Sequence, residues 1–345
     1  MGENMKKKTI IYFTQIWDMN IGNAFIDIGA LISLNEAMNG KEYILTETGI
    51  LNLELDSITK IQRIGPIVRP FWRVFGKYLG RDFLDKRYNM IKSIDRFNLA
   101  EAIKADYAIF SGCILTVIYF STKERLFEKL KENGVKIIFY GVGGNTYSDF
   151  EVNYIREKLK SIKPYAILTR DSVAFKHYSD LAEYAFDGLE PAFYLNKLSY
   201  LKDIELNITP YVVLTFDKPE NRDIEKKLEE KFGTDYNVIK ASHIPFPNKA
   251  YFIDTPPPKT RFISNSSYDY LILYSHAKEV HSDRVHACVP TLAFGNPCRL
   301  YNKTLRANLF EKVCIGNITK EICRINNISK LQRKQVDILS QVIES

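Results

Sequence analysis

Cysteine, histidine and tryptophan are scarce in this chain of 345 residues, and the patterns usually built from them are missing. The five cysteines are scattered, and none forms a CxxC pair. This excludes a disulfide framework or a zinc ribbon and favours a reducing compartment. No cluster of carboxylates or histidines has metal-ligand spacing, so we expect neither a metal nor a cofactor.

Long apolar runs are also absent, because no stretch approaches the roughly 20 residues that a membrane-spanning helix needs. The segment 1–17 begins with charged residues, but its apolar run is short and lacks a small-residue cleavage site. It is therefore interpreted as a first strand rather than a signal peptide. With 46% hydrophobic and 26% charged residues, the chain has a globular composition and is long enough for two domains. We expect a cytoplasmic protein.

The two common glycine-rich phosphate motifs are missing as well. Ser111-Gly112-Cys113 and Gly141–Gly144 are interpreted as turns after strands, but neither fits GxGxxG or GxxxxGK. No dinucleotide site or P-loop is predicted. Gly143 and Asn145 remain candidates for contact with a ligand, because backbone can approach a ligand closely at such a turn.

Strands and helices alternate along most of the chain. Apolar runs such as 9–16, 106–111 and 165–169 are each followed by a turn and a helical pattern, and a second series begins at 211–216. This alternation predicts parallel sheets covered by helices. The prediction is an α/β protein with two Rossmann-like domains facing each other across a cleft. The N-terminal domain is 1–198 and the C-terminal domain is 199–345, with a last helix that crosses back to the first domain.

The stretch with the most candidate functional residues runs from Lys278 to Lys303. A short strand at 278–281 is followed by Ser282 or Asp283 as helix N-cap and by apolar residues at helical spacing. Arg284 and His286 then lie in the first helical turn, where the helix end is partly positive and suits an anion. The next strand, 298–301, brings in Tyr301 and Lys303. The alternative is that Arg284 and His286 are ordinary surface or capping groups.

Three more polar residues follow predicted strands. Asn20 and Asn23 come after the first strand, and Arg170 follows the strand 165–169. Carboxyl ends of parallel strands share one sheet edge, so these side chains are candidates for a ligand site. Helix capping explains Asn20 equally well, and an ion pair with Asp171 is the alternative for Arg170.

The segment 58–98 interrupts the alternation of predicted strands and helices. Between Lys60 and Arg96 there are ten Lys or Arg and three Asp, an excess that equals the net charge of +7 of the whole chain. Aromatic residues lie among the cations, as in Arg69, Trp72, Arg73 and Arg81. Such a segment suits an anionic membrane surface or a pyrophosphate-bearing acceptor. The alternative is a solvated basic face, and nucleic acid is not expected because no nucleic-acid module is present.

Taken together, these pieces resemble the polysaccharide pyruvyl transferase family over nearly the whole chain. The matching motifs are Asn20-Ile-Gly, the glycines 141–144, Thr169-Arg-Asp-Ser, Asp187 with Pro191-Ala-Phe, Asp283-Arg-Val-His-Ala, Asn296-Pro and Tyr301-Asn-Lys. The resemblance implies a glycosyltransferase-B type fold and transfer of the enolpyruvyl group of phosphoenolpyruvate to a sugar, which forms a pyruvate ketal. It assigns donor binding to Arg170, Arg284 and Lys303 and acid/base catalysis near neutral pH to His286.

The chain departs from the family pattern at three positions. The family usually has Asp at the position of Asn23, a second Gly at that of Cys113 and Leu at that of Val285. The expected acceptor is a sugar of surface polysaccharide or cell-wall glycan. If carried on polyprenyl diphosphate, it would bring the protein to the inner membrane surface. Two alternatives stay open: a nucleotide-sugar glycosyltransferase of the same fold, and a non-catalytic glycan-binding relative.

Overall fold

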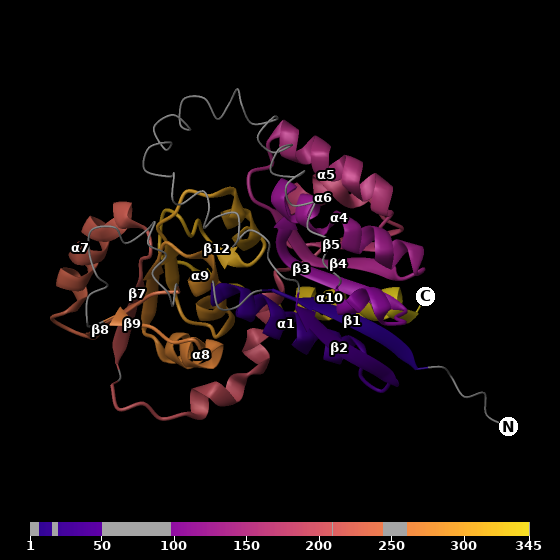
Figure 1. Ribbon diagram of the computed structural model, residues 1–345. Helices are drawn as coiled ribbons and strands as arrows, with labels where there is room; N and C mark the ends of the chain where they lie inside the picture. Colours follow the sequence, from indigo (N-terminus) through magenta and orange to yellow (C-terminus); the bar gives the residue numbers. More distant parts are fainter. Residues whose placement is uncertain (1–6, 16–19, 50–97, 209, 244–260, 345) are drawn as a thin grey trace.

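The computed structural model describes residues 7–15, 20–49, 98–208, 210–243 and 261–344. The chain forms two α/β halves, each built on its own sheet (Figure 1). The first sheet has the order β2-β1-β3-β4-β5-β6, and all its neighbouring strands are parallel. Its strands are β1 (Lys8–Thr14), β2 (Tyr43–Gly49), β3 (Tyr107–Leu115), β4 (Lys136–Gly144), β5 (Ala166–Thr169) and β6 (Tyr184–Asp187).

The second sheet is also parallel, with the order β11-β10-β7-β8-β9. Its strands are β7 (Tyr211–Thr215), β8 (Asn237–Ala241), β9 (Arg261–Phe262), β10 (Glu279–Ser282) and β11 (Cys298–Leu300). The sheets are therefore formed by consecutive parts of the chain, 8–187 and 211–300. A small antiparallel pair, β12 (Cys314–Ile315) and β13 (Arg324–Ile325), follows the second sheet.

Helices cover both faces of the first sheet. Side chains of α4 (Val117–Glu132), α5 (Asp149–Ile162) and α6 (Ser172–Tyr178) pack with alternate strand residues on one face. On the other face α1 (Gly22–Ala37) and α10 (Ser329–Glu344) pack with the intervening strand residues. Continuous apolar strands are what a sheet buried on both faces requires.

Helix α1 also joins the two halves. Ile21, Phe25 and Ile28 belong to a core that includes residues of α8 (Ser267–His276) and α9 (Val285–Ala293) in the second half. Figure 1 shows α1 between the two sheets. At Gly29 the helix is so close to the chain at Pro191 that an added Cβ would lie 2.1 Å from the Pro191 carbonyl oxygen. This close contact fixes the position of the 3-10 helix η3 (Pro191–Lys197).

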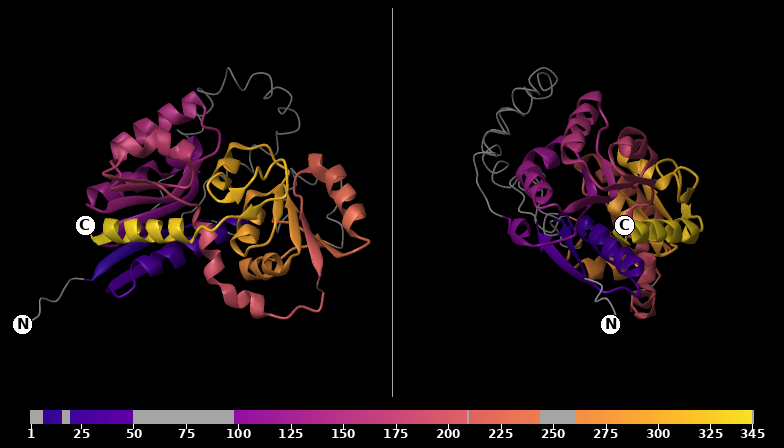
Figure 2. Two further views of the ribbon diagram at one scale, coloured as in Figure 1. Left: turned by 180° about the vertical axis from the view of Figure 1, so that it is seen from behind. Right: turned by 90° about the vertical axis from the view of Figure 1, so that its right-hand side faces the viewer.

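The C-terminal helix α10 returns to the first half, where it lies along the sheet (Figure 2). Leu339, Val342 and Ile343 are buried in the core of that sheet. The Tyr107 hydroxyl donates to the Ile343 carbonyl at 2.7 Å, and the Leu189 N–H donates to Gln335 Oε1 at 2.5 Å. The helix α7 (Arg222–Phe232) completes the second half.

The two glycine segments that were predicted as turns are instead irregular ends of β3 and β4. The pairing of these strands continues to Leu115 and Gly144 with register shifts. Gly112 and Gly141 have φ angles of +92° and +62°, which glycine adopts without strain. An added Cβ at Gly141 would lie 2.2 Å from Pro191 Cδ, so this glycine permits close packing within the protein.

The segment 196–210 connects the two halves and contains the end of η3 and a second 3-10 helix, η4 (Ser199–Asp203). The last helix, α10, begins at Ser329, shortly after β13.

The basic segment predicted at 58–98, with Arg69, Trp72, Arg73 and Arg81, lies outside the described residues except for Asn98. Asn98 caps a short 3-10 helix, η1 (Leu99–Ala102). None of the helices that the structure describes is both long and apolar enough to span a lipid bilayer.

Candidate functional site

Each sheet has a point where its strand order reverses, and ligands of open α/β sheets bind at the carboxyl edge of such points. In the second sheet this point lies between β7 and β10. There, Arg284 Nε lies 3.2 Å from Asp217 Oδ2. Arg284 Nη2 also donates to Asn20 Oδ1 of the first half at 3.0 Å. One arginine thus links the carboxyl edges of the sheets of both halves.

The predicted capping of α9 by Ser282 or Asp283 is wrong. Arg284 occupies the N-cap position, and no side chain caps the helix. Asp283 is buried and instead accepts hydrogen bonds from the Asp217 and Lys218 N–H groups, at 3.1 and 2.9 Å, and from Asn221 Nδ2 at 2.9 Å. The carboxylate therefore organises the loop after β7. The helix N-terminus beside Arg284 has no anionic cap.

His286 lies inside the protein, with 4% of its surface exposed. Its Nε2 is 3.7 Å from Glu190 Oε1, and its Nδ1 is 3.5 Å from Arg306 Nη2. Gly22 of α1 covers the ring, and an added Cβ there would lie 2.7 Å from His286 Cβ. Burial lowers the pKa of His286 to about 4, and Glu190 only partly offsets this effect. The free protein thus carries a neutral imidazole, not the group titrating near neutral pH that was expected.

Arg170 forms a buried ion pair with Glu190, with Nη1 2.8 Å from Oε2. The two side chains are 1% and 0% exposed. Arg170 Nε and Nη2 are buried and have no hydrogen-bond partner in the described part of the chain. Burial raises the pKa of Glu190, but Arg170 and His286 together hold it below the ordinary value. The alternative pairing of Arg170 with Asp171 is wrong, because Asp171 caps α6 through the Ala174 N–H.

Arg306 is the cation of this site that the sequence analysis missed. It belongs to the 3-10 helix η6 (Leu305–Phe310), and its Nε is buried without a hydrogen-bond partner. Among the described residues no carboxylate pairs with it. Burial is the main cause of its lowered pKa, and Arg170 and Arg284 act in the same direction. No sequence motif singles out Arg306, which lies three residues after Lys303, the cation that the family resemblance assigns to the donor.

We call these five side chains, Arg170, Glu190, Arg284, His286 and Arg306, the arginine junction. Glu190 neutralises Arg170, and Asp217 pairs with Arg284. Arg306 remains without a counter-ion among the described residues. A partly buried guanidinium beside an imidazole and an uncapped helix N-terminus suits a small anion with phosphate or carboxylate groups.

The remaining predicted residues lie at various distances from this centre. Asn23 accepts a weak hydrogen bond from Asn20 Nδ2 at 3.5 Å. Gly143 touches Arg170, since an added Cβ would be 2.5 Å from Nε. Asn145 is exposed after β4. The Tyr301 hydroxyl is 3.0 Å from His281 Nδ1, within the second half.

Lys303 is not part of the arginine junction in this structure. It is exposed and lines a surface pocket of about 590 Å³ with residues of η6 and of the loop 316–319. Since η6 starts two residues after Lys303, the chain turns back here and brings Arg306 toward His286.

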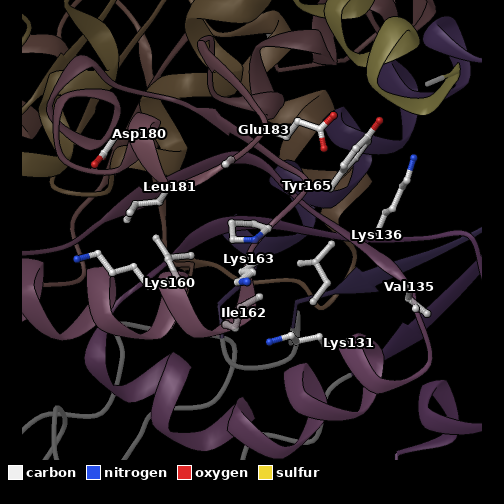
Figure 3. Close-up of a pocket in the computed structure, with 15 residues that line it drawn as sticks. Lys131, Val135, Lys136, Lys160, Ile162, Lys163, Tyr165, Asp180, Leu181 and Glu183 are labelled. Carbon is white, nitrogen blue, oxygen red and sulfur yellow. The ribbon is translucent and has the colours of Figure 1, made fainter.

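Another pocket, of about 600 Å³, lies at the amino ends of β4, β5 and β6 (Figure 3). Lysines surround it, among them Lys136, whose Nζ lies 4.1 Å from the centre of the Tyr165 ring. Arg170 and Glu190 follow the opposite, carboxyl ends of β5 and β6. This pocket is therefore at the other edge of the sheet from the candidate site.

The fold is of the glycosyltransferase-B type, with two Rossmann-like halves, which confirms the predicted fold class. The structure is similar to the Staphylococcus aureus MnaA–UDP structure, with a TM-score of 0.52, 12% identity and coverage of 97% of this chain and 91% of the other. It is also similar to a Listeria monocytogenes protein assigned as a UDP-N-acetylglucosamine 2-epimerase, with a TM-score of 0.51, 11% identity and coverage of 98% and 91%. No family model and no curated protein matches the sequence.

The buried imidazole predicts acid sensitivity of the fold. The pKa of His286 is about 4 in the folded protein and 6.5 ordinarily, so the unfolded chain binds a proton that the folded one does not. The free energy of unfolding should therefore fall as pH is lowered from about 6.5 to 4, by about 3 kcal/mol in total from this group. Urea denaturation at several pH values measures how steeply the free energy of unfolding depends on pH. His286→Gln should make this dependence shallower, and an unchanged dependence would assign the effect to other groups.

Proposed function

We propose that this chain is a phosphoenolpyruvate-dependent transferase that forms a pyruvate ketal on a sugar during glycan biosynthesis. The observation that carries the proposal is Arg306, a guanidinium that lies beside His286 and has no counter-ion in the part of the chain that the structure describes. Phosphoenolpyruvate has a phosphate and a carboxylate close together, and separate arginines can bind one each. Further support comes from the motif Asp283-Arg-Val-His-Ala, which contains Arg284 and His286 and resembles the polysaccharide pyruvyl transferase family.

In this proposal the residues have distinct roles. Arg306, Arg284 and the N-terminus of α9 hold the anionic groups of the donor, and Arg170 contributes its unpartnered N–H groups. His286, neutral before the donor binds, is the proposed acid/base group of the transfer. Of the two hydroxyl protons that the ketal replaces, one ends on the methylene carbon and the other leaves with the phosphate. The first half, with Asn20 and Asn23, faces the sugar.

The second candidate is an enzyme that uses a nucleotide sugar. The fold likeness to a structure with bound UDP favours it, because the same arginines could hold a diphosphate. Calorimetric titration of the full chain with phosphoenolpyruvate, UDP and a UDP-sugar separates the two. Binding of phosphoenolpyruvate alone supports pyruvyl transfer, whereas binding of UDP or the UDP-sugar without phosphoenolpyruvate supports the second candidate.

Arg306 and Lys303 form a matched pair for testing the donor site. Arg306→Gln should weaken phosphoenolpyruvate binding about 10- to 100-fold, because a charge-assisted hydrogen bond in a partly buried site contributes roughly 1.5–3 kcal/mol. Lys303→Gln removes an exposed charge outside the junction and should change affinity less than about threefold. Both dissociation constants are measured by calorimetry. The reverse order of effects would return the donor site to Lys303.

A further inference from the structure

Two buried polar atoms of the arginine junction face each other without bonding. Within the residues that the structure describes, Glu190 Oε1 and His286 Nε2 both lack a hydrogen-bond partner, and they are 3.7 Å apart. Leaving buried polar atoms unpaired costs free energy, and native proteins seldom do so without a reason. The gap closes if one atom shifts by less than 1 Å, which brings the pair into ordinary hydrogen-bond range.

The contacts of the imidazole define its tautomer. Arg306 can only donate, so His286 Nδ1, at 3.5 Å from Arg306 Nη2, is the unprotonated nitrogen. The proton of the neutral ring is then on Nε2 and directed at Glu190. Glu190 Oε2 is held in turn by Arg170 at 2.8 Å. Glu190 therefore orients the ring, as the outer carboxylate of many histidine sites does.

The charges around His286 come from several elements. Arg306 of η6, Arg170 after β5 and Arg284 at the N-cap of its own helix are cationic, and His243 is a further ring nearby. The facing carboxylate is Glu190, at the N-cap of η3, and α1 presents the uncharged Gly22. In the free protein burial is the main factor that opposes a second proton on the ring, and the cations Arg306 and Arg170 add to it. A bound anion that occupies the arginines would remove the part due to the cations and place a negative charge beside the ring.

We propose that Glu190 is a positioning residue and that binding of a phosphate-bearing anion at the arginine junction adds one solvent proton to His286 Nδ1. Arg306 turns its N–H groups from the ring to the anion, and Nε2–H closes on Glu190 as a charge-assisted hydrogen bond. The inference rests on the donor site of the proposed function. It makes His286 an acid when the donor is bound, with Nδ1–H directed at the anion.

Proton uptake is measurable by calorimetry of the full chain at pH 7 in buffers of different ionisation enthalpy. We expect phosphoenolpyruvate, and inorganic phosphate separately, to draw between half a proton and one proton more into the wild type than into His286→Gln. The difference between the two proteins cancels protons that the ligand itself gains or loses. Glu190→Gln should still bind phosphate, with the uptake reduced by at least half.

A spectroscopic readout keeps the test independent of the stability of the Glu190 variant. The chain has five histidines, so the ring nitrogens can be assigned by NMR of ¹⁵N-labelled wild type and single variants. Phosphate should convert the His286 ring from the Nε2–H tautomer to the doubly protonated form. Binding without this change, and with equal proton counts in wild type and His286→Gln, would overturn the inference and leave the donor site intact.

The two proposals fail in different ways. Uptake with inorganic phosphate but no binding of phosphoenolpyruvate would overturn the proposed donor and support the proton linkage. If neither ligand binds the full chain, the anion site itself is wrong, and both proposals fall with it.

Discussion

Replacing His286 by glutamine is expected to lower the rate of pyruvyl transfer by about 10²- to 10⁴-fold, the usual contribution of a positioned acid or base. That loss corresponds to about 3–5 kcal/mol in activation free energy. Glutamine keeps much of the polar volume, so the packing against Gly22 is retained while proton transfer is lost. Phosphate release from phosphoenolpyruvate, measured with the sugar acceptor that the wild type uses best, reports the rate.

His276→Gln is the matched control for this variant. His276 lies at the end of α8, where its Nδ1 is 3.0 Å from the Ile272 carbonyl oxygen, and it does not contact the arginine junction. Its activity should stay within about twofold of the wild type. Near-UV circular dichroism verifies the packing of both variants. A loss below tenfold in a well-folded His286→Gln would remove His286 from the acid/base role.

Truncating Glu190 to alanine should destabilise the protein by about 3–5 kcal/mol, because it leaves the buried Arg170 guanidinium without its counter-ion. The pair is almost fully excluded from solvent, with 1% and 0% exposure. The double variant Arg170→Met/Glu190→Leu should recover most of this loss, since a buried ion pair and apolar residues of similar volume are often close in stability.

Urea denaturation of the single and double variants gives the comparison. If the double variant is as unstable as Glu190→Ala, the cost comes from lost packing at η3 rather than from the unpaired charge. Arg156→Met removes an ion pair with Asp180 near the surface. It shows how much a half-exposed ion pair contributes to the free energy of unfolding. That change should cost only about 1 kcal/mol or less.

Much of the fold could be predicted because it depends on local pattern. Strands such as β3 and β7 are apolar runs between turn signals, and the helix after Ser282 follows from its apolar spacing. Arg284 and His286 were found for the same reason, since a strand end and a helix start fix where they lie. The position of Arg170 at the carboxyl edge of the first sheet, and of Arg284 at that of the second, followed from parallel topology alone.

The partners of these residues could not be predicted from local pattern. Glu190 precedes a proline in a segment without periodicity, and its contacts to Arg170 and His286 depend on how the two halves pack. The choice between Lys303 and Arg306 depends on the path of η6, which the apolar pattern does not define. The low pKa of His286 results from burial at the interface between the halves, so it too required the structure.

The return of α10 to the first sheet affects how the protein is made. Leu339, Val342 and Ile343 complete one face of a core whose other fully buried members lie before residue 169. On the ribosome, most of the strands of that sheet emerge long before these side chains do. The N-terminal half therefore exposes part of an apolar sheet face throughout synthesis of the second half, and it can complete its core only when residue 343 has left the exit tunnel.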